Sequence, residues 1–462
     1  MGLRLWSIIT ALTVVAALMQ GCGAFTNSGA PPRLTPPMGW NSWNSGIALT
    51  QQSIETVIDA MVKSGMRDAG YRYVNLDAGW AARTRGPHGE LVADPTRFPA
   101  GIPALARYAH ARGMLLGLYS SPYNQTCGQG PGTASAGHEV IDARTFASWG
   151  VDYLKYDWCR SGANHGEQVR VFTAMRDALR DTGHRIFYSI NPNSADDHTA
   201  GVDFDWSSIA DMTRNTTDLV PVWRPTLPPL GSTDAFLRRT HLGVVDQFAA
   251  AGPAAKRSRP GYFNDPDMLV VGVPWSDYFT RHLEANRIKW ARNELTPQEL
   301  ETLLPQFALS PEEVAWRATA QPSLTETEQR AHFSLWAILA APLIAGNDVA
   351  SMTEQTRAVL TNSDVIAVDQ DRLVAQATAL PDDNRVLVKP LADGAVAVAL
   401  FNPENQPAAI ATSASSVGLH NASCYTVRDL WTHRDITSAG QITDPAVPPH
   451  GVTMLRISPT CR

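Results

Sequence analysis

The sequence lacks the features of several common classes of protein. It has no excess of positive charge, and a net charge of −6 argues against nucleic acid as a partner, because phosphate binding needs a basic face. The 12 histidines are scattered, with neither an HExxH motif nor clustered ligand spacing, so no catalytic metal is expected. There is no G-x-S-x-G motif and no glycine-rich phosphate loop after a first strand, which argues against an α/β-hydrolase and a nucleotide-binding sheet.

Tryptophan, in contrast, is well represented, with 13 residues in a chain of otherwise ordinary composition. Indole rings stack on the apolar faces of sugars, so this count weakly favours a carbohydrate partner, although most tryptophans serve core packing. A chain of 462 residues is expected to form two domains, one of them large.

The N-terminus is typical of an export signal. Arg4 precedes an apolar stretch over 8–19 that is too short for a stable membrane span, so we interpret residues 1–21 as a signal peptide. The following MQGC segment resembles a bacterial lipobox, in which Cys22 would carry a lipid anchor; cleavage nearby without a lipid is the alternative. Residues 23–37 are expected to form a linker. The expected location is therefore the cell envelope, the periplasm or the medium.

Cysteine usage supports export. Five cysteines are an odd number, which is awkward in an oxidising compartment, but a lipidated Cys22 would leave four. These fall into two pairs close in sequence, one in each expected domain: Cys127 with Cys159, and Cys424 with Cys461. Buried free thiols in a cytoplasmic protein are the alternative, which conflicts with the signal segment.

Strand and helix signals alternate after the linker. Helical periodicity covers 54–62, 102–109, 142–149 and 169–179, and short apolar runs cover 73–76, 114–119, 151–157 and 186–190. Alternation of this kind over 38–368 predicts a (β/α)8 TIM barrel, with an open doubly wound sheet as the alternative. Barrel enzymes carry their chemistry at the carboxyl ends of the strands. The residues expected at those ends are Asp77, Tyr119, Asp157, Asn191 and Asp265.

The pattern changes near residue 370. Strand-like runs without a convincing helix predict a C-terminal antiparallel β-sandwich over 370–462. We expect it to pack against the barrel, and a separate sugar-binding role is the alternative. Residues 224–260 and 287–322 look inserted; they are expected either to line the substrate cleft or to decorate the surface.

The run VDYLKYDWC over 151–159 is the most informative segment. Alternate side chains of a strand share a face, so Tyr153, Lys155 and Asp157 are expected to point the same way. A lysine two residues from a carboxylate would keep it ionised, as a glycosidase nucleophile must be. From the residues alone, a structural Lys–Asp pair at a strand end is an equally good interpretation.

A retaining glycosidase also needs a proton donor about 5–5.5 Å from the nucleophile. The segment 212–218 offers Asp218, with Arg214 able to reach sugar hydroxyls, although this spacing is common on any helix. Asp265 and Asp267 add two acids at an expected strand end, where an Asx-type turn is the alternative for Asp265.

Together these motifs resemble glycoside hydrolase family 27, the α-galactosidase (melibiase) group. The resemblance runs from about Thr35 to the C-terminus, apart from the two insertions. It is carried by TPPMGWNSW ending at Trp43, NQTC ending at Cys127, KYDWC over 155–159, Arg214 to Asp218, NDPDM over 264–268 and AAPLIAGND over 340–348.

The resemblance implies an exo-acting, retaining α-galactosidase that needs no cofactor. Asp157 would be the nucleophile and Asp218 the general acid/base in a double displacement. It also implies a disulfide between Cys127 and Cys159. The sugar ligands expected from the resemblance and from the strand ends are Trp43, Asp77, Tyr119, Lys155, Asn191, Arg214 and Asp267. The expected partner is an oligosaccharide or polysaccharide with an α-linked terminal sugar, and a membrane is expected only through the possible lipid.

Two positions depart from the family pattern. The family usually has two consecutive aspartates, which hold the hydroxyls at C4 and C6, where this chain has Asp77 and Ala78. Ala78 removes one acceptor, and a hydrogen bond to a charged group is worth roughly 1.5–3 kcal/mol. Asn191 stands where many members carry an acid near the 2-hydroxyl. One hypothesis is therefore a pocket that accepts a substituent at C6, as in the isomaltose-releasing α-1,6-glucanases of the family. A non-catalytic surface sugar-binding protein is a second alternative, against which the presence of both catalytic acids argues.

Overall fold

The computed structural model of the protein describes residues 34–127, 129–159, 164–193, 199–226, 241–291, 308–420 and 422–461. The expected signal peptide over 1–21, Cys22 and most of the expected linker over 23–37 lie outside these residues. Within the described ranges, no helix is both long and apolar enough to cross a bilayer.

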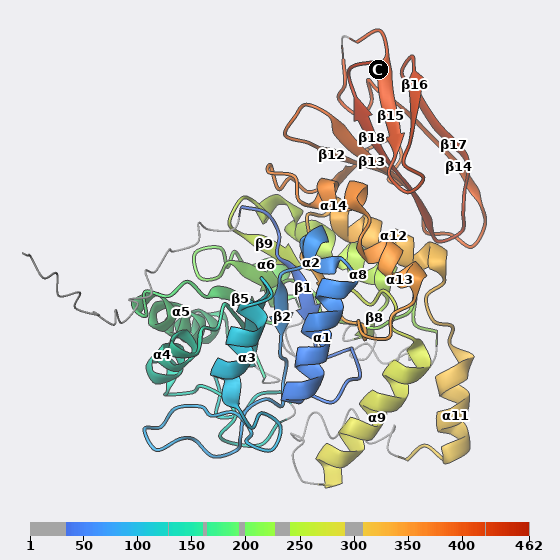
Figure 1. Ribbon diagram of the computed structural model, residues 1–462. Helices are drawn as coiled ribbons and strands as arrows, with labels where there is room; N and C mark the ends of the chain where they lie inside the picture. Colours follow the sequence, from blue (N-terminus) through green and yellow to red (C-terminus); the bar gives the residue numbers. More distant parts are fainter. Residues whose placement is uncertain are drawn as a thin grey trace, which may run out of the picture.

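Eight parallel strands form a closed barrel in the amino-terminal part of the chain (Figure 1). They are β1 (Met38–Asn41), β2 (Tyr73–Asn75), β3 (Leu115–Ser120), β4 (Tyr153–Asp157), β5 (Phe187–Asn191), β6 (Met212–Arg214), β9 (Phe263–Asp265) and β10 (Leu343–Ala345). The order of the strands follows the chain, and β10 pairs with β1. The circle closes where Leu269, just after β9, bridges Ala345. An open doubly wound sheet is thereby excluded, and the predicted barrel is confirmed.

Helices cover the outside of the barrel. They are α1 (Gln51–Lys63), α2 (Met66–Ala69), α3 (Gly101–His110), α4 (Glu139–Trp149), α5 (His165–Asp181), α6 (Ala200–Asp203), α8 (Val244–Ala251), α9 (Trp275–Ala291), α11 (Pro311–Ala320), α12 (Glu326–Ile338), α13 (Glu354–Leu360) and α14 (Ser363–Asp369), with a 3₁₀ segment at Gly252–Arg257. The helix α1 illustrates why they form: Thr50 and Ser53 make a capping box, and the apolar face of the helix is buried.

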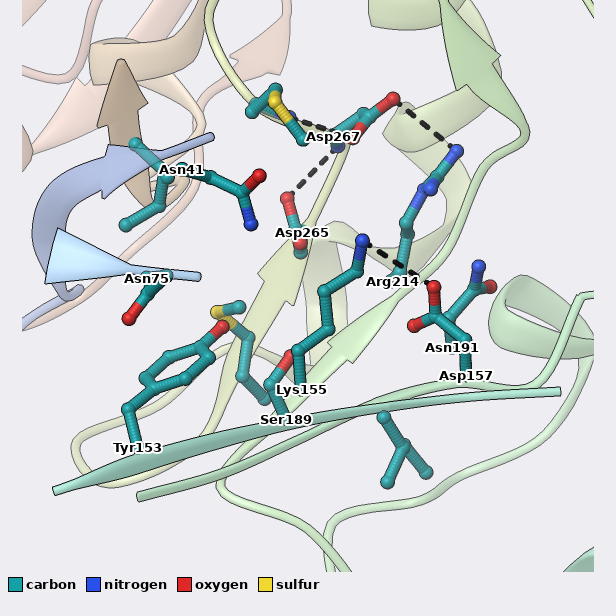
Figure 2. A pocket seen from close by; sticks show the side chains of 14 residues that line it. Asn41, Asn75, Tyr153, Lys155, Asp157, Ser189, Asn191, Arg214, Asp265 and Asp267 are labelled. Atoms are coloured by element: carbon teal, nitrogen blue, oxygen red, sulfur yellow. Dashed lines mark hydrogen bonds and ion pairs between the residues drawn. The ribbon is translucent and has the colours of Figure 1, made fainter. Parts of the chain in front are cut away.

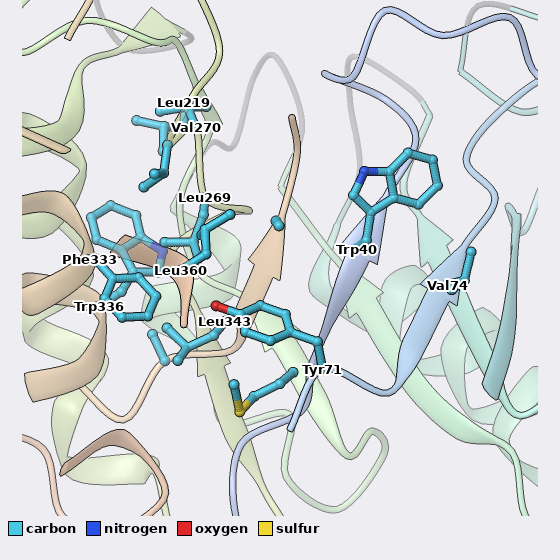
Figure 3. Close-up of a cluster of buried hydrophobic side chains, with 14 of the residues drawn as sticks. Trp40, Tyr71, Val74, Leu219, Leu269, Val270, Phe333, Trp336, Leu343 and Leu360 are labelled. Atoms are coloured by element: carbon cyan, nitrogen blue, oxygen red, sulfur yellow. The ribbon is translucent and has the colours of Figure 1, made fainter. Parts of the chain in front are cut away.

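The core has two parts that matter for the site. Between the barrel and α12, Trp40, Leu343 and Trp336 belong to one large apolar cluster (Figure 3). Inside the barrel, a smaller cluster is built from Tyr73, Tyr153, Phe187, Met212 and Phe263. The rings of Tyr153 and Phe187 stack with centroids 5.4 Å apart. Since Tyr153 points into the barrel, Lys155 and Asp157 do too, and the aromatic cluster forms the floor beneath them.

The C-terminal part is the predicted antiparallel β-sandwich. Its strands are β11 (Thr378–Ala379), β12 (Val386–Pro390), β13 (Val396–Asn402), β14 (Ala408–Ser413), β15 (Tyr425–Asp429), β16 (Arg434–Ser438), β17 (Gln441–Val447) and β18 (Gly451–Ser458). Six of them form one sheet, and β14 pairs with β17 across a shared apolar core. A disulfide joins Cys424 to Cys461, with Cα atoms 5.8 Å apart. The sandwich packs on α12, where Trp431 donates from Nε1 to Ser334 Oγ at 2.9 Å.

Candidate active site

Neighbouring strands bring five of the predicted site residues into one cavity: Lys155, Asp157, Asn191, Arg214 and Asp267. Its lining does not include Trp43, Asp77, Tyr119 or Asp218. Asp157 ends β4 and is in register with Asn191 at the end of β5, and Arg214 at the end of β6 is in register with Asp265. The cavity is lined by Asn41, Asn75, Tyr153, Lys155, Asp157, Ser189, Ile190, Asn191, Met212, Arg214, Asp265, Asp267, Met268 and Ile344 (Figure 2). It opens at the carboxyl end of the barrel, where the sequence predicts the chemistry.

Lys155 joins two of the carboxylates. Its Nζ lies 2.8 Å from Asp77 Oδ2 and 3.3 Å from Asp157 Oδ2, and 5.0 Å from the centroid of the Tyr119 ring. Asp77 Oδ2 also accepts a hydrogen bond from Asn41 at 3.1 Å. Burial opposes the positive charge, but the carboxylates of Asp157 and Asp77 outweigh burial and raise the pKa of Lys155. The lysine therefore stays charged at the centre of the site.

Asp157 is held by Lys155 on one side only. Its Oδ1 is buried and has no hydrogen-bond partner among the described residues, whereas Oδ2 faces Lys155. Burial raises the pKa of Asp157 to about 6, with Lys155 opposing and Asp77 reinforcing the rise. Lys155 favours the carboxylate, as the sequence predicts, but burial is the larger effect and sets the direction of the shift. Above that pKa, Asp157 provides a carboxylate whose Oδ1 is not paired within the part of the chain that the structure describes.

A second cation, Arg214, joins two other acids. Its Nη2 lies 2.6 Å from Asp218 Oδ1 and 3.2 Å from Asp267 Oδ2. Arg214 and Asp267 are buried, whereas the side chain of Asp218 is 60% exposed. Asp218 begins β7 (Asp218–Leu219), which pairs with β8 (His241–Leu242), so its spacing from Arg214 is that of a strand and loop, and the helical interpretation is excluded. Asp218 is therefore the acid that can exchange protons with solvent.

Asp265 and Asp267 are both structural and part of the cavity. Asp265 Oδ1 accepts from the amide of Asp267 at 2.9 Å, which confirms the Asx-type turn. Asp267 has φ 82°, and its Oδ2 accepts from the amide of Leu219 at 2.8 Å, next to Asp218. Burial raises the pKa of Asp265 to about 7, with Asp267 adding to the rise and Arg214 opposing it. The turn thus fixes Asp267 against Arg214 and the start of β7.

The remaining predicted residues surround this cavity. Tyr119 lies beneath Lys155, and its backbone carbonyl accepts from Trp80 Nε1 at 2.8 Å. Asn191 lines the cavity, and its Oδ1 accepts from the amide of Asn193 at 3.2 Å. Trp43 follows β1 outside the cavity lining, is 37% exposed, and meets the edge of His282 at 5.8 Å. The amide of Trp43 donates to Oδ1 of the lining residue Asn41 at 2.8 Å, so its backbone is next to the cavity.

The loops after β3 and β4 are linked covalently next to the cavity. A disulfide joins Cys127 to Cys159, with Cα atoms 5.0 Å apart, and Cys159 lies two residues after Asp157. The pairing implied by the family resemblance is present. Among the described residues, no group of three or more His, Cys, Asp or Glu side chains is arranged to hold a metal ion.

Seven neutral residues of the cavity were not predicted from the sequence: Asn41, Asn75, Ser189, Ile190, Met212, Met268 and Ile344. Asn41 and Asn75 each end a barrel strand, in register with one another. The strand-end rule that selected Asp77 and Asn191 could therefore have found both, whereas Ser189 and Met268 carry no distinctive signal.

Comparison with known proteins connects this geometry to a family. The profile described as alpha galactosidase A matches residues 35–278 and 319–371, and that of the alpha galactosidase C-terminal beta sandwich domain matches 381–457. The chain belongs to glycoside hydrolase family 27. Membership confirms the predicted resemblance, and with it an enzyme of the glycoside hydrolase class.

Relatives within family 27 match nearly the whole chain. An α-galactosidase A of Cellvibrio japonicus is 33% identical and covers 98% of this chain and 99% of its own. An α-galactosidase of rice is 35% identical over 92% of this chain and 85% of its own. The crystal structure of α-galactosidase I from Mortierella vinacea, at 30% identity, superposes with a TM-score of 0.74 and covers 94% of this chain and 98% of that one.

The family profile also corrects the predicted insertions. Its first matched range, 35–278, includes 224–260, so that segment lies within the family match, although 227–240 lie outside the described residues. The unmatched stretch is 279–318, which begins earlier than the predicted 287–322. Its first residues are therefore in α9, beside the site.

Proposed function

We propose that the protein is an exo-acting, retaining α-galactosidase that cleaves terminal α-galactosyl residues by double displacement. The observation that carries the proposal is that each proposed catalytic acid has its own cation. Lys155 forms an ion pair with Asp157, and Arg214 forms an ion pair with Asp218. The proteins named above as α-galactosidases, at 33–35% identity, support the same substrate class.

In the first step, Asp157 attacks the anomeric carbon while Asp218 protonates the leaving oxygen. The buried Asp157, with one oxygen held by Lys155, suits a positioned nucleophile. In the second step, Asp218 takes a proton from water, which displaces Asp157 from the anomeric carbon and restores the configuration. The exposure of Asp218 suits an acid that must exchange protons twice in each cycle.

The other polar side chains would hold the sugar. Asp77 and Lys155 form a buried donor–acceptor pair within reach of neighbouring hydroxyls, and Asn191 and Asp267 lie across the cavity. We assign Trp43 to the rim and Tyr119 to the support of Lys155. Export, with or without a lipid at Cys22, completes the proposal and is supported by the two disulfides.

The test is the stereochemistry and rate of hydrolysis of p-nitrophenyl α-galactoside. NMR of the first product formed should show α-galactose. Asp157→Asn should lower kcat by at least about 10³-fold, since no nucleophile remains. Asp218→Ala should be rescued by azide with formation of α-galactosyl azide, because the small anion needs no general base. Asp382→Asn, at an exposed site, is the matched control.

β-Galactose as the first product would exclude retention. An unchanged rate in Asp157→Asn would remove the nucleophile assignment, and sugar binding without any turnover by the wild type would favour the non-catalytic alternative.

The substitution at Ala78 supports a second candidate, an isomaltose-releasing α-1,6-glucanase with the same fold and acids. The amide of Ala78 donates to Asp77 Oδ1 at 2.8 Å, so its side chain lies beside a proposed sugar ligand. Product analysis on melibiose and dextran separates the two. Release of galactose with dextran untouched supports the α-galactosidase, and release of a disaccharide from dextran supports the glucanase.

A further inference from the structure

A short irregular segment connects the barrel to the proposed acid. Residues 215–217, the acid segment, lie between the end of β6 at Arg214 and the start of β7 at Asp218, and they form neither helix nor strand. Asn215 and Thr216 within it are buried. Because buried backbone carbonyls need donors, a segment outside the regular structure takes them largely from side chains. The position of Asp218 therefore depends on the partners of this segment.

Gln247 on α8 supplies donors to the acid segment. Its side chain is fully buried on the otherwise apolar face of the helix. Nε2 lies 2.7 Å from Thr216 Oγ1, 2.7 Å from the carbonyl of Thr217 and 2.8 Å from the carbonyl of Pro266. Pro266 precedes Asp267 in the chain. One amide group thus joins the acid segment to the turn that fixes Asp267.

The orientation of this amide follows from its partners. Backbone carbonyls only accept hydrogen bonds, so the group that faces the carbonyls of Thr217 and Pro266 has to be the NH2 group of Gln247. The Oε1 atom is buried and has no hydrogen-bond partner among the described residues. Leaving a buried acceptor unpaired costs about 1–3 kcal/mol, which the hydrogen bonds of the NH2 group have to offset. The side chain is therefore placed to donate.

A second buried amide, that of Asn193, donates to the same region. Asn193 lies two residues after β5, and its Nδ2 is 3.1 Å from the carbonyl of Arg214 and 3.0 Å from the carbonyl of Thr216. Its Oδ1 accepts from the amide of Gly201 on α6 at 2.9 Å. A Cβ atom at Gly201 would lie 2.1 Å from the carbonyl oxygen of Arg214, so α6 packs directly on the chain here. Together the two amides bind the carbonyls at 214, 216 and 217.

The helix that carries Gln247 is also connected to the strand that carries Asp218. Asp218 on β7 is in register with His241 on β8, and α8 follows β8 after one residue, Gly243. A Cβ atom at Gly243 would lie 2.5 Å from the carbonyl oxygen of Trp223, so this connection is tightly packed. Gln247 lies in the first turn of α8. The strand pairing and the amide therefore fix the same helix relative to Asp218.

We propose that Gln247 is the positioning residue of the acid/base, which holds the acid segment so that Asp218 reaches the glycosidic oxygen. The proposal rests on the proposed function, since it takes Asp218 as the acid. Gln247 does not line the cavity, so it acts through Asp218 and not on the sugar. A displaced acid fails with leaving groups that need a proton, and a leaving group that departs without one is spared.

The experiment compares kcat/KM for melibiose, whose sugar leaving group has to be protonated, with kcat/KM for α-galactosyl fluoride, whose leaving group departs readily without a general acid. The ratio of the two constants does not depend on the fraction of enzyme that is folded. Gln247→Met keeps the approximate shape and removes both donors, so the ratio should fall by about tenfold or more. Gln247→Glu keeps the shape and polarity with at most one donor, and the ratio should fall in this variant too.

The matched control is a glutamine that joins other parts of the chain. Gln329 on α12 donates from Nε2 to the carbonyl of Leu324 at 3.0 Å and accepts from the amide of Gly272 at 3.1 Å. Gln329→Met makes the same chemical change and should leave the ratio as it is in the wild type.

A second measurement adds azide to the reaction with α-galactosyl fluoride. When the base is displaced, water attacks the glycosyl-enzyme slowly, whereas azide needs no general base. Azide should therefore raise kcat of Gln247→Met severalfold and form α-galactosyl azide. The wild type and Gln329→Met should show no such rise.

The outcomes separate the two proposals. If the Gln247 variants lower both constants by the same factor, or leave them unchanged, and do not respond to azide, the positioning role is overturned and the proposed function stands. An equal fall of the ratio in Gln329→Met also overturns it, since any lost amide would then act alike. If Gln247→Met does not fold, Gln247→Glu decides. A wild type that hydrolyses neither substrate overturns the proposed function itself.

Discussion

At the scale of single residues, the site depends on how charge is shared. Lys155 lies between Asp77 and Asp157, so a change in one acid alters the electrostatic interaction of the lysine with the other. Burial and Asp77 both disfavour the ionised form of Asp157, and Lys155 favours it. The pKa of the nucleophile is thus a balance that a single substitution can shift in a known direction.

The acid limb of the pH profile should report this balance. For the wild type, kcat/KM on α-galactosyl fluoride should rise with pH through about 6, the pKa of Asp157. Asp77→Asn removes a negative charge that raises the pKa of Asp157. It also leaves Asp157 as the one of these two acids that still forms an ion pair with Lys155. Both effects favour the carboxylate, so the acid limb should move to lower pH even though overall activity falls. A limb that stays in place would show that Asp157 does not control it, and Asp382→Asn should leave the limb unchanged.

Ala78 offers a second test at this scale. Refilling the position with Ala78→Asp supplies a carboxylate beside Asp77, which should shift preference toward unsubstituted galactosides by about tenfold, as expected for a gained hydrogen bond to a charged group. The measurement is kcat/KM for p-nitrophenyl α-galactoside relative to a 6-O-substituted α-galactoside, with Ala78→Ser as a control of similar size. An unchanged preference would mean that the space at residue 78 does not determine specificity.

The site residues that could be predicted are those with a distinctive type in a distinctive place. Lys155 and Asp157 follow from strand alternation, and both line the cavity. The raised pKa of Asp157 could not be predicted, because burial depends on the closed barrel and its aromatic floor. Ser189 lines the same cavity, yet a serine in an apolar strand carries no signal that separates it from an ordinary core residue.

At the scale of elements, the long periodic segments were predicted and the polar ones were not. The expected helix over 54–62 is α1, and the expected strand over 151–157 contains β4. In the sandwich, β16 was missed because its residues are nearly all exposed, so no apolar alternation marks it. The start of α9, in contrast, could have been predicted. Its buried residues Trp275, Tyr278, Phe279 and Leu283 follow the i, i+3, i+4, i+8 spacing of one apolar helical face.

A buried ion pair holds the loop after β2 to α4, and this element contact can be tested. Arg85 donates from Nη1 and Nη2 to the two oxygens of Asp142 at 2.8 and 2.9 Å, and Asp142 Oδ1 also accepts from the amide of Leu91. Asp142→Ala would leave the arginine buried without its acid. We expect the free energy of unfolding to fall by about 3 kcal/mol or more, measured by denaturant titration.

The matched control is an exposed pair of the same chemistry. Arg176 and Asp177 are adjacent on α5, and the Asp177 side chain is 55% exposed. Asp177→Ala should cost less than about 1 kcal/mol, because solvent screens the pair. Equal losses in the two variants would contradict the role assigned to the Asp142 pair.

At the scale of the whole molecule, α12 connects the sandwich to the active site. One side of the helix receives Trp431 and Lys389 from the sandwich, whose side chains donate to Ser334 Oγ and to the carbonyl of Ala337. From the other side, Trp336 donates from Nε1 to the carbonyl of Asp267 at 2.8 Å. The sandwich therefore supports the turn that fixes Asp267, which favours a structural role for it over a separate sugar-binding role.

The junction also holds a buried acid and base. Asp369 at the end of α14 and Lys389 on β12 are both fully buried. Burial raises the pKa of Asp369 to about 8, with Lys389 opposing, and burial lowers the pKa of Lys389, with Asp369 and Asp371 opposing. Tyr71 faces Asp369 and stays protonated, because burial and that carboxylate both raise its pKa. Between about pH 4 and 8 the folded state therefore keeps Asp369 protonated, whereas the unfolded state ionises it, so the junction loses stability as pH rises through this window.

Asp369→Asn should remove this pH dependence. In the wild type, Asp369 is protonated in the folded state and ionised in the unfolded state once the pH exceeds its ordinary pKa of about 4. The folded state then binds the extra proton, so this contribution to stability is greatest at low pH and is lost as pH rises, by about 1.4 kcal/mol per unit, up to the folded pKa of about 8. The measurement is the free energy of unfolding of variant and wild type at about pH 5, 6 and 7. Asp369→Asn has no group left to titrate at this position, so its stability should fall less steeply over this range. If the two curves run parallel, Asp369 does not carry the proton, and the junction is held together by packing and backbone hydrogen bonds alone.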